Sequence, residues 1–185
     1  LTHLPVERQS EAKVKFKAGY LNEKMQETSL MDGTRFELDF DYKMPFGKKG
    51  SMLVDSDNEY ISTTFNNGLG GAKILDARVS TTFNYDLAKN VSAGVGPRAS
   101  VLNASVNYDG NKVELTDFAL GLEANATLST EHLDAKVSYA LSKGMGGDGE
   151  QGSNPITKNT IKAEATGKIG KASATLAYEY NKDKQ

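Results

Sequence analysis

The chain has 185 residues, with 22 Lys and Arg against 24 Asp and Glu, so its formal net charge is −2. This near balance argues against nucleic-acid binding, which needs a basic excess. The chain contains two histidines and no cysteine. It therefore has no disulfide, no thiolate metal site and little material for histidine catalysis. We expect no enzymatic activity, no metal and no other cofactor. Because no stretch approaches 18 consecutive apolar residues, we also expect no transmembrane helix.

A period of two dominates the sequence. Residues 73–87, KILDARVSTTFNYDL, carry mostly apolar side chains at odd positions and polar side chains at even positions. Successive side chains of a strand point to opposite faces, so this pattern predicts a β-strand with one apolar face. Helical spacing does not persist for ten residues anywhere, and we interpret the chain as all-β. The alternation recurs in residues 13–20, 36–43, 102–108, 118–128, 133–142, 161–169 and 171–180.

Turn residues separate these runs. Asp109-Gly110-Asn111 is a strong signal for a tight hairpin turn. Residues 55–58 either lie within one strand or split 51–66 into a short hairpin. Residues 91–108, which contain glycine and proline, form either one long bulged strand or two short ones. The count is therefore nine or ten strands. Three longer connections are expected at about residues 21–33, 66–72 and 144–159.

Short turns can join only antiparallel neighbours, and no helix is expected to cover a sheet face. The predicted fold is an up-and-down antiparallel β-barrel of about 8–10 strands. We place a single barrel domain at residues 13–181, after an N-terminal segment at 1–12 and before a tail at 182–185.

The alternation fits two kinds of barrel. In a transmembrane barrel the apolar face meets lipid, and in a soluble barrel it points inward. Long strands, with tyrosines near several strand ends, favour the transmembrane barrel. The absence of tryptophan and the 8% aromatic content favour the soluble one. We prefer the transmembrane barrel, with a lipid-facing or girdle set of Phe16, Tyr20, Phe40, Tyr42, Phe83, Tyr85, Tyr108, Tyr139, Tyr178 and Tyr180.

The alternative is a soluble, secreted or periplasmic, β-barrel or sandwich that binds an apolar ligand or a protein partner. The apolar faces of several strands would then enclose a cavity. Its lining would be Phe36, Leu38, Phe40, Phe83, Phe118, Leu120 and Leu122.

Three segments resemble the bacterial outer-membrane β-barrels of the porin type. They are ARVSTTFNYDL at 77–87, LNASVNYDGNKVEL at 102–115 and LDAKVSYAL at 133–141. The resemblance is one of architecture and covers roughly residues 13–180. It implies a closing strand that ends in Phe or Trp, whereas this chain ends in NKDKQ. Either a last strand is missing from the chain or the sheet is not such a barrel.

The polar faces carry charges of both signs, close to balance. A barrel of nine or ten strands is nearly filled by its side chains, so opposite charges would pair across it. We expect a non-enzymatic outer-membrane barrel, either a narrow passive pore for small hydrophilic solutes or a structural surface protein. Its partners would be membrane lipid and lipopolysaccharide, and its oligomeric state stays open. The expected pore-lining residues are Lys15, Lys17, Glu37, Asp39, Asp41, Arg78, Glu123, Lys136, Lys162 and Glu164.

Overall fold

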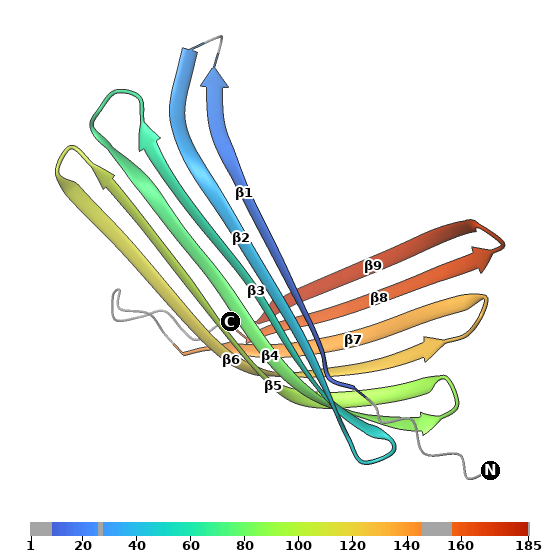
Figure 1. Ribbon diagram of the computed structural model, residues 1–185. Coiled ribbons are helices and arrows are strands. Elements are labelled where there is room, and N and C mark those ends of the chain that lie inside the picture. Colours follow the sequence, from blue (N-terminus) through green and yellow to red (C-terminus); the bar gives the residue numbers. More distant parts are fainter. Residues whose placement is uncertain (1–8, 26–27, 146–156, 185) are drawn as a thin grey trace.

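A computed structural model describes residues 9–25, 28–145 and 157–184. These residues form nine β-strands and no helix (Figure 1). None of their segments is a helix long and apolar enough to cross a membrane. The strands are β1 (Glu11–Met25), β2 (Thr28–Phe46), β3 (Gly50–Phe65), β4 (Gly70–Ala88), β5 (Val91–Tyr108), β6 (Asn111–Ser129), β7 (Leu133–Gly144), β8 (Thr157–Ile169) and β9 (Ala172–Lys184).

The nine strands form one sheet in sequence order, and every neighbouring pair is antiparallel. The predicted all-β, up-and-down antiparallel order is confirmed. Tight turns join several strands. Asp109 and Gly110 have φ angles of 49° and 78°, and Asn90 has 69°. These left-handed conformations suit Gly, Asn and Asp, so the Asp109-Gly110 hairpin prediction is also confirmed.

The strands are longer than the alternation suggested. β3 runs unbroken through residues 55–58, and β5 is a single strand through Gly94, Gly96 and Pro97. The expected connection at 21–33 is wrong, because β1 continues to Met25 and β2 begins at Thr28. The connection expected at 66–72 is shorter, since β4 begins at Gly70. Most of the third expected connection, and residues 1–8 of the N-terminal segment, lie outside the described residues.

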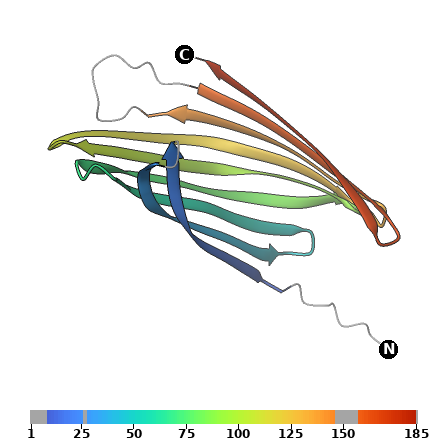
Figure 2. The same cartoon turned by 90° about the horizontal axis from the view of Figure 1, so that it is seen from above.

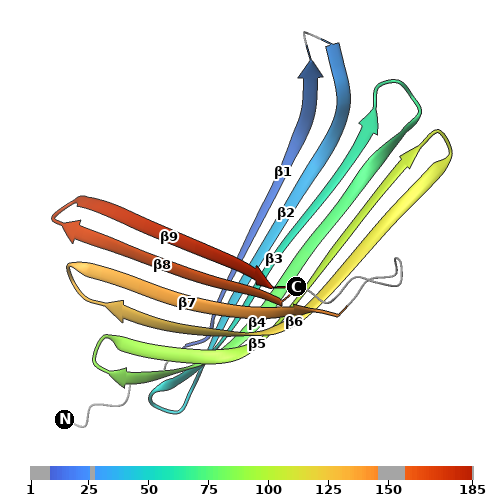
Figure 3. The ribbon, with the colours of Figure 1, turned by 180° about the vertical axis from the view of Figure 1, so that it is seen from behind.

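The sheet is strongly bent and does not close on itself. In Figure 1, β1–β4 rise to the upper left and β7–β9 extend to the right, and Figure 3 shows the same bend from behind. Seen from above, β1 and β9 lie at the two margins of one curved sheet (Figure 2). Glycines permit close backbone approach in the bend. A Cβ at Gly96 would collide with the backbone of Thr81, and one at Gly121 with that of Leu141.

The burial pattern is the reverse of that in a soluble domain. Among the described residues, Ala140 is the one buried hydrophobic residue. The buried polar residues are Ser51, Ser80, Thr82 and Asn84. The described residues form no apolar core, so the stability of the sheet comes from the hydrogen-bonded ladders and from side chains along the strands.

Candidate membrane face and charged trough

Strand register assigns every side chain to one of two faces. Ser80, Thr82 and Asn84 are buried, so their face is the concave side of the bend, which we call the trough. On the opposite, convex face of the same strand, Phe83 and Tyr85 are more than half exposed. Directly paired residues share a face, which extends both assignments across all nine strands.

A largely apolar band, which we call the belt, covers the convex face and includes the polar residues Ser56, Asn58 and Thr81. It consists of every second residue in nine spans, and none of these side chains is charged. Each span is nine to eleven residues long, which is the length a tilted strand needs to cross a bilayer. The spans are 12–20, 36–46, 52–60, 75–85, 91–101, 118–128, 133–141, 161–169 and 172–180.

The belt has a sharp border at the end of the sheet that carries the β5–β6 hairpin. On every strand, one step along the convex face changes an apolar or aromatic residue into a polar one. Aromatic residues stand at this border on β1, β2, β3, β6 and β9, as in the aromatic girdles of membrane barrels. The border pairs are Tyr20/Asn22, Phe36/Thr34, Tyr60/Ser62, Leu75/Lys73, Val101/Asn103, Phe118/Thr116, Leu141/Lys143, Ile161/Asn159 and Tyr180/Lys182.

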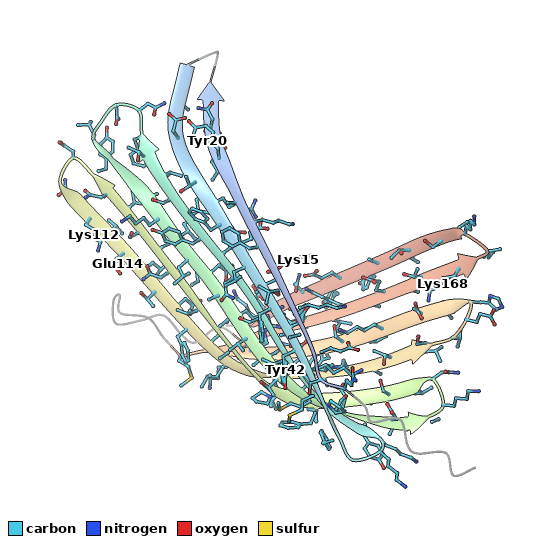
Figure 4. The ribbon with its side chains drawn as sticks, viewed as in Figure 1. Lys15, Tyr20, Tyr42, Lys112, Glu114 and Lys168 are labelled. Atoms are coloured by element: carbon cyan, nitrogen blue, oxygen red, sulfur yellow. The ribbon has the colours of Figure 1, made fainter. Side chains whose placement is uncertain are left out.

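Side-chain hydrogen bonds mark the same border. The Tyr20 hydroxyl donates to Asp32 at 2.6 Å, just beyond the belt, and the Tyr139 hydroxyl donates to Asn159 at 2.6 Å. Tyr20 lies near the far end of β1 in Figure 4. Each tyrosine therefore has an apolar ring at the belt and a hydroxyl among polar groups, the arrangement that suits a boundary between apolar and aqueous surroundings.

Beyond the border, polar side chains of β5 and β6 lie on the convex face and apolar ones lie on the trough side. Lys112 and Glu114 lie on the convex side there, near the β5–β6 hairpin (Figure 4). Lys112 Nζ lies 2.7 Å from Glu114 Oε2, and Asn103 donates to Glu114 Oε1 at 3.2 Å. These two hydrogen bonds, with that from Lys112 the stronger, hold the pKa of the Glu114 carboxyl below its usual value. The outer surface beyond the belt is thus polar and charged, as expected of a segment that projects into water.

One predicted girdle residue, Tyr108, lies on the wrong face. It pairs with Gly70, so it lies on the trough side, where its ring is 6.1 Å from that of Phe65. Near Val101 the apolar side chains of β5 change from one face to the other, although the strand has no bulge there. The alternation of residues 102–108 therefore predicted the convex face for Tyr108. The other nine predicted residues are on the convex face: Phe16, Tyr20, Phe40, Tyr42, Phe83, Tyr85, Tyr139, Tyr178 and Tyr180.

The ten residues predicted to line a pore all lie on the trough side. They are Lys15, Lys17, Glu37, Asp39, Asp41, Arg78, Glu123, Lys136, Lys162 and Glu164. Several make ion pairs: Lys17 Nζ lies 3.7 Å from Glu37, and Lys162 Nζ lies 3.8 Å from Glu179.

Arg35 and Arg78 pair with acidic residues of the trough, and of these sequence reasoning missed Asp55, Asp57 and Glu59. Arg78 donates to Asp55 at 3.0 Å and also pairs with Asp57. Arg35 pairs with Glu37 at 2.7 Å and Glu59 at 2.6 Å. Each guanidinium thus bridges two carboxylates through one nitrogen, Nη2. In the sequence, the residues 55–58 looked like an acidic turn because polar side chains occupy both faces of β3 there.

A hollow of about 250 Å³ lies in the trough. Within the described part of the chain, Glu123 Oε2 is buried there without a hydrogen-bond partner, and Arg98 Nε, on the neighbouring strand β5, is also buried without one. Arg98 was also missed, because Gly94, Gly96 and Pro97 interrupt the alternation around it. The hollow combines cations and carboxylates from five strands: Glu11, Lys13, Asp41, Lys43, Asp55, Glu123 and Lys136.

No family model and no curated protein matches the sequence. Among solved structures, the chain is similar to the β domain of the Bordetella autotransporter BrkA. The two share 14% sequence identity over 94% of this chain and 80% of that chain, with a TM-score of 0.48.

Proposed function

We propose that the chain is a non-enzymatic β-barrel protein of the bacterial outer membrane, with its belt in lipid and its trough as the barrel interior. The carrying observation is the belt itself: an uncharged convex face on all nine strands, in spans of bilayer length with a common border. Water would be a poor solvent for this surface, since soluble monomers rarely expose apolar patches beyond a few hundred Å².

The soluble alternative needs the same apolar side chains to enclose a ligand. The structure contradicts that cavity. Phe83 is 51% exposed and Leu122 is 56% exposed on the convex face. The other residues of the expected lining, Phe36, Leu38, Phe40, Phe118 and Leu120, share this face.

Lipid headgroups and lipopolysaccharide fit the surface next to the belt. Lys73, Lys143 and Lys182 each lie one step beyond the border residue of their strand on the convex side. Long basic side chains at this level can place their ammonium groups among anionic phosphates while their methylene stems cover the belt's edge.

The trough supports a narrow passive path for small hydrophilic solutes, with a structural or surface role as the competing assignment. A barrel of about eight strands is filled by its own side chains, and a wide channel needs sixteen or more. The Arg78 and Arg35 clusters would occupy much of such an interior. Mixed charges along the remaining path would govern which solutes pass.

The test is folding into detergent micelles, followed by electrophoresis in SDS with and without heating. We expect a compact band that heating converts to a slower one, and only after micelle insertion. Monodisperse folded protein in plain buffer without this shift would overturn the proposal. Planar-bilayer recordings on the inserted protein then distinguish the two roles: small conductance steps indicate a pore, and their absence indicates a structural barrel.

A further inference from the structure

The trough side of the sheet is apolar at the end that carries the β5–β6 hairpin. Two successive rows of directly paired residues cross β1–β6 there, one from Gly19 to Leu115 and one from Leu21 to Val113. Arg35 and Thr63 are polar, and the other members of these rows are apolar or glycine. We call the large apolar side chains of the two rows the inner patch: Leu21, Ile61, Ile74, Val106, Val113 and Leu115.

The inner patch is open to water. Val113 is 71% exposed and Leu115 is 55% exposed. With the belt in lipid, these side chains lie on the other face of the sheet and beyond the border, so lipid does not cover them. An apolar body on the patch would release water from it, which is favourable. From Ile61 to Leu115 the patch crosses four strands, about 14 Å at the usual strand spacing, so it suits an extended apolar body.

The next row towards the middle of the trough has more carboxylates than the neighbouring cations can pair. Lys17 and Arg35 contact the two carboxylates on β2 and β3. Within the described residues, the side chains of Asp76 and Asp117 make no hydrogen bond and no ion pair. The row is Lys17, Glu37, Glu59, Asp76, Leu102 and Asp117.

Asp76 and Asp117 flank Leu102, which is directly paired with both. Their backbones are therefore two strand spacings apart, about 10 Å, and their side chains share the trough side. A positive group placed over Leu102 would lie between the two carboxylates, and an apolar chain attached to it would reach the inner patch in the next row. An anionic group at the same place would meet two like charges, which is unfavourable.

We propose that the inner patch and the Asp76–Asp117 pair form a binding site for an amphipathic organic cation, such as an alkylammonium compound. The site rests on the proposed function, because the trough is then the barrel interior and the ligand enters it as a solute. The two carboxylates hold the cationic head, and the apolar body covers Val106, Val113 and Leu115. Charge complementarity selects this ligand over fatty acids, and the patch selects it over small inorganic cations.

Tryptophan fluorescence reports the ligand directly, because the natural chain contains no tryptophan. Val113→Trp places the reporter on the inner patch, and Ser105→Trp is its matched control on the convex face. Both variants are folded into phosphatidylcholine vesicles and titrated with octyltrimethylammonium, then with octyl sulfate, which has the same chain and the opposite charge. For Val113→Trp we expect a saturable change in emission with the cation and about tenfold weaker binding of the anion. Ser105→Trp should show no saturable change.

Carboxylate variants in the Val113→Trp background test how the cationic head is held. We expect Asp76→Asn and Asp117→Asn each to weaken binding of octyltrimethylammonium by about two- to fivefold, and the double variant by about tenfold. Glu114→Gln removes a carboxylate from the convex face of the strand that carries Asp117, and it should leave the affinity unchanged.

Equal affinity for the two octyl ligands, or no saturable change with the cation, would overturn the proposal. An unchanged affinity in the double variant, or an equal loss in Glu114→Gln, would also overturn it. The heat-modifiable shift is measured on every variant. If the shift is intact and binding is absent, the ligand site alone is wrong. If the unsubstituted chain lacks the shift, the proposed function fails and the site fails with it.

Discussion

Thr82 and Phe83 are neighbours on β4, yet Thr82 is 5% exposed and Phe83 is 51% exposed. The hydroxyl side chain is covered by the trough, and the aromatic ring stands free on the convex face. In a soluble protein the exposures would be exchanged, because burying the larger apolar surface is the favourable choice. The whole sheet has the same inverted arrangement, with polar side chains covered in the trough and large apolar side chains exposed on the convex face.

Single cysteines at these two positions should report different surroundings. We expect a fluorophore on Phe83→Cys to be quenched by nitroxide-labelled lipids in vesicles, because the belt faces the acyl chains. The same fluorophore on Thr82→Cys should be protected from the lipid quencher. Lys73→Cys, which lies on the convex face beyond the belt, should respond to a water-soluble quencher instead. Equal lipid quenching at positions 82 and 83 would contradict the assignment of the faces.

A charge in the middle of the belt should be costly. Leu122 lies near the centre of the β6 span, and Thr116 lies on the same face of the same strand beyond the border. We expect Leu122→Arg to lower the free energy of unfolding from lipid vesicles by about 2–4 kcal/mol and Thr116→Arg by about 0–1 kcal/mol. Urea titration of the vesicle-folded protein measures both. Similar losses in the two variants would argue against a lipid environment limited to the belt.

The sequence predicted the two faces well because a strand's period is two, and an uninterrupted alternation fixes every side chain once one is placed. Lys162 and Glu164 could thus be assigned to the same face as Arg78 without knowing how β4 and β8 are arranged. The inference failed at Tyr108 because local alternation does not reveal a change of phase. The continuous pairing of β5 with β6 shows one unbroken strand, so Tyr108 and Arg98, ten residues apart on it, lie on one face.

The ends of the strands could not be predicted for a physical reason. Beyond the belt, both faces of a strand can meet water, so neither needs to be apolar and the alternation lapses while backbone pairing continues. Residues 21–33 looked like a loop on this account, although Asn22 and Asp32 are directly paired in β1 and β2. The bend of the sheet is likewise a property of neighbouring strands, and it alone brings Asp55 and Glu123 to one hollow.

Removal of Arg78 should destabilise the sheet, because it leaves Asp55 and Asp57 without their shared cation. We expect Arg78→Met to cost about 0–1 kcal/mol, because Asp55 and Asp57 are 46% and 50% exposed and water screens the lost pairs. Arg35→Met is the matched comparison. Its guanidinium is more exposed, 44% against 23%, but its carboxylates Glu37 and Glu59 are less exposed, 25% and 33%, so we expect a loss of the same order.

The same unfolding titration separates this interpretation from simple loss of packing. Adding Asp57→Asn to Arg78→Met removes one of the unpaired charges, so part of the lost stability should return. If the double variant is less stable than Arg78→Met alone, the carboxylates are not what Arg78 stabilises.

Glu114 should give the surface beyond the belt a measurable acid response. Its pKa is lowered by hydrogen bonds from Lys112 and Asn103, so the folded state favours the ionised carboxylate. A depressed pKa contributes stability above the unfolded-state value near 4.5, and this contribution is lost as the pH falls through the lower folded-state value. The stability difference between the natural chain and Glu114→Gln should therefore be present at neutral pH and disappear in acid.

Thermal unfolding of the micelle-inserted protein between pH 7 and pH 3 measures this difference. The effect should be small, since water and salt screen an exposed pair. It should shrink further in a Lys112→Gln background, where the stronger of the two hydrogen bonds is missing, and at high ionic strength. A difference that grows as the pH falls would mean that Glu114 is stabilised in its protonated form, and the interpretation of its contacts with Lys112 and Asn103 would then be wrong.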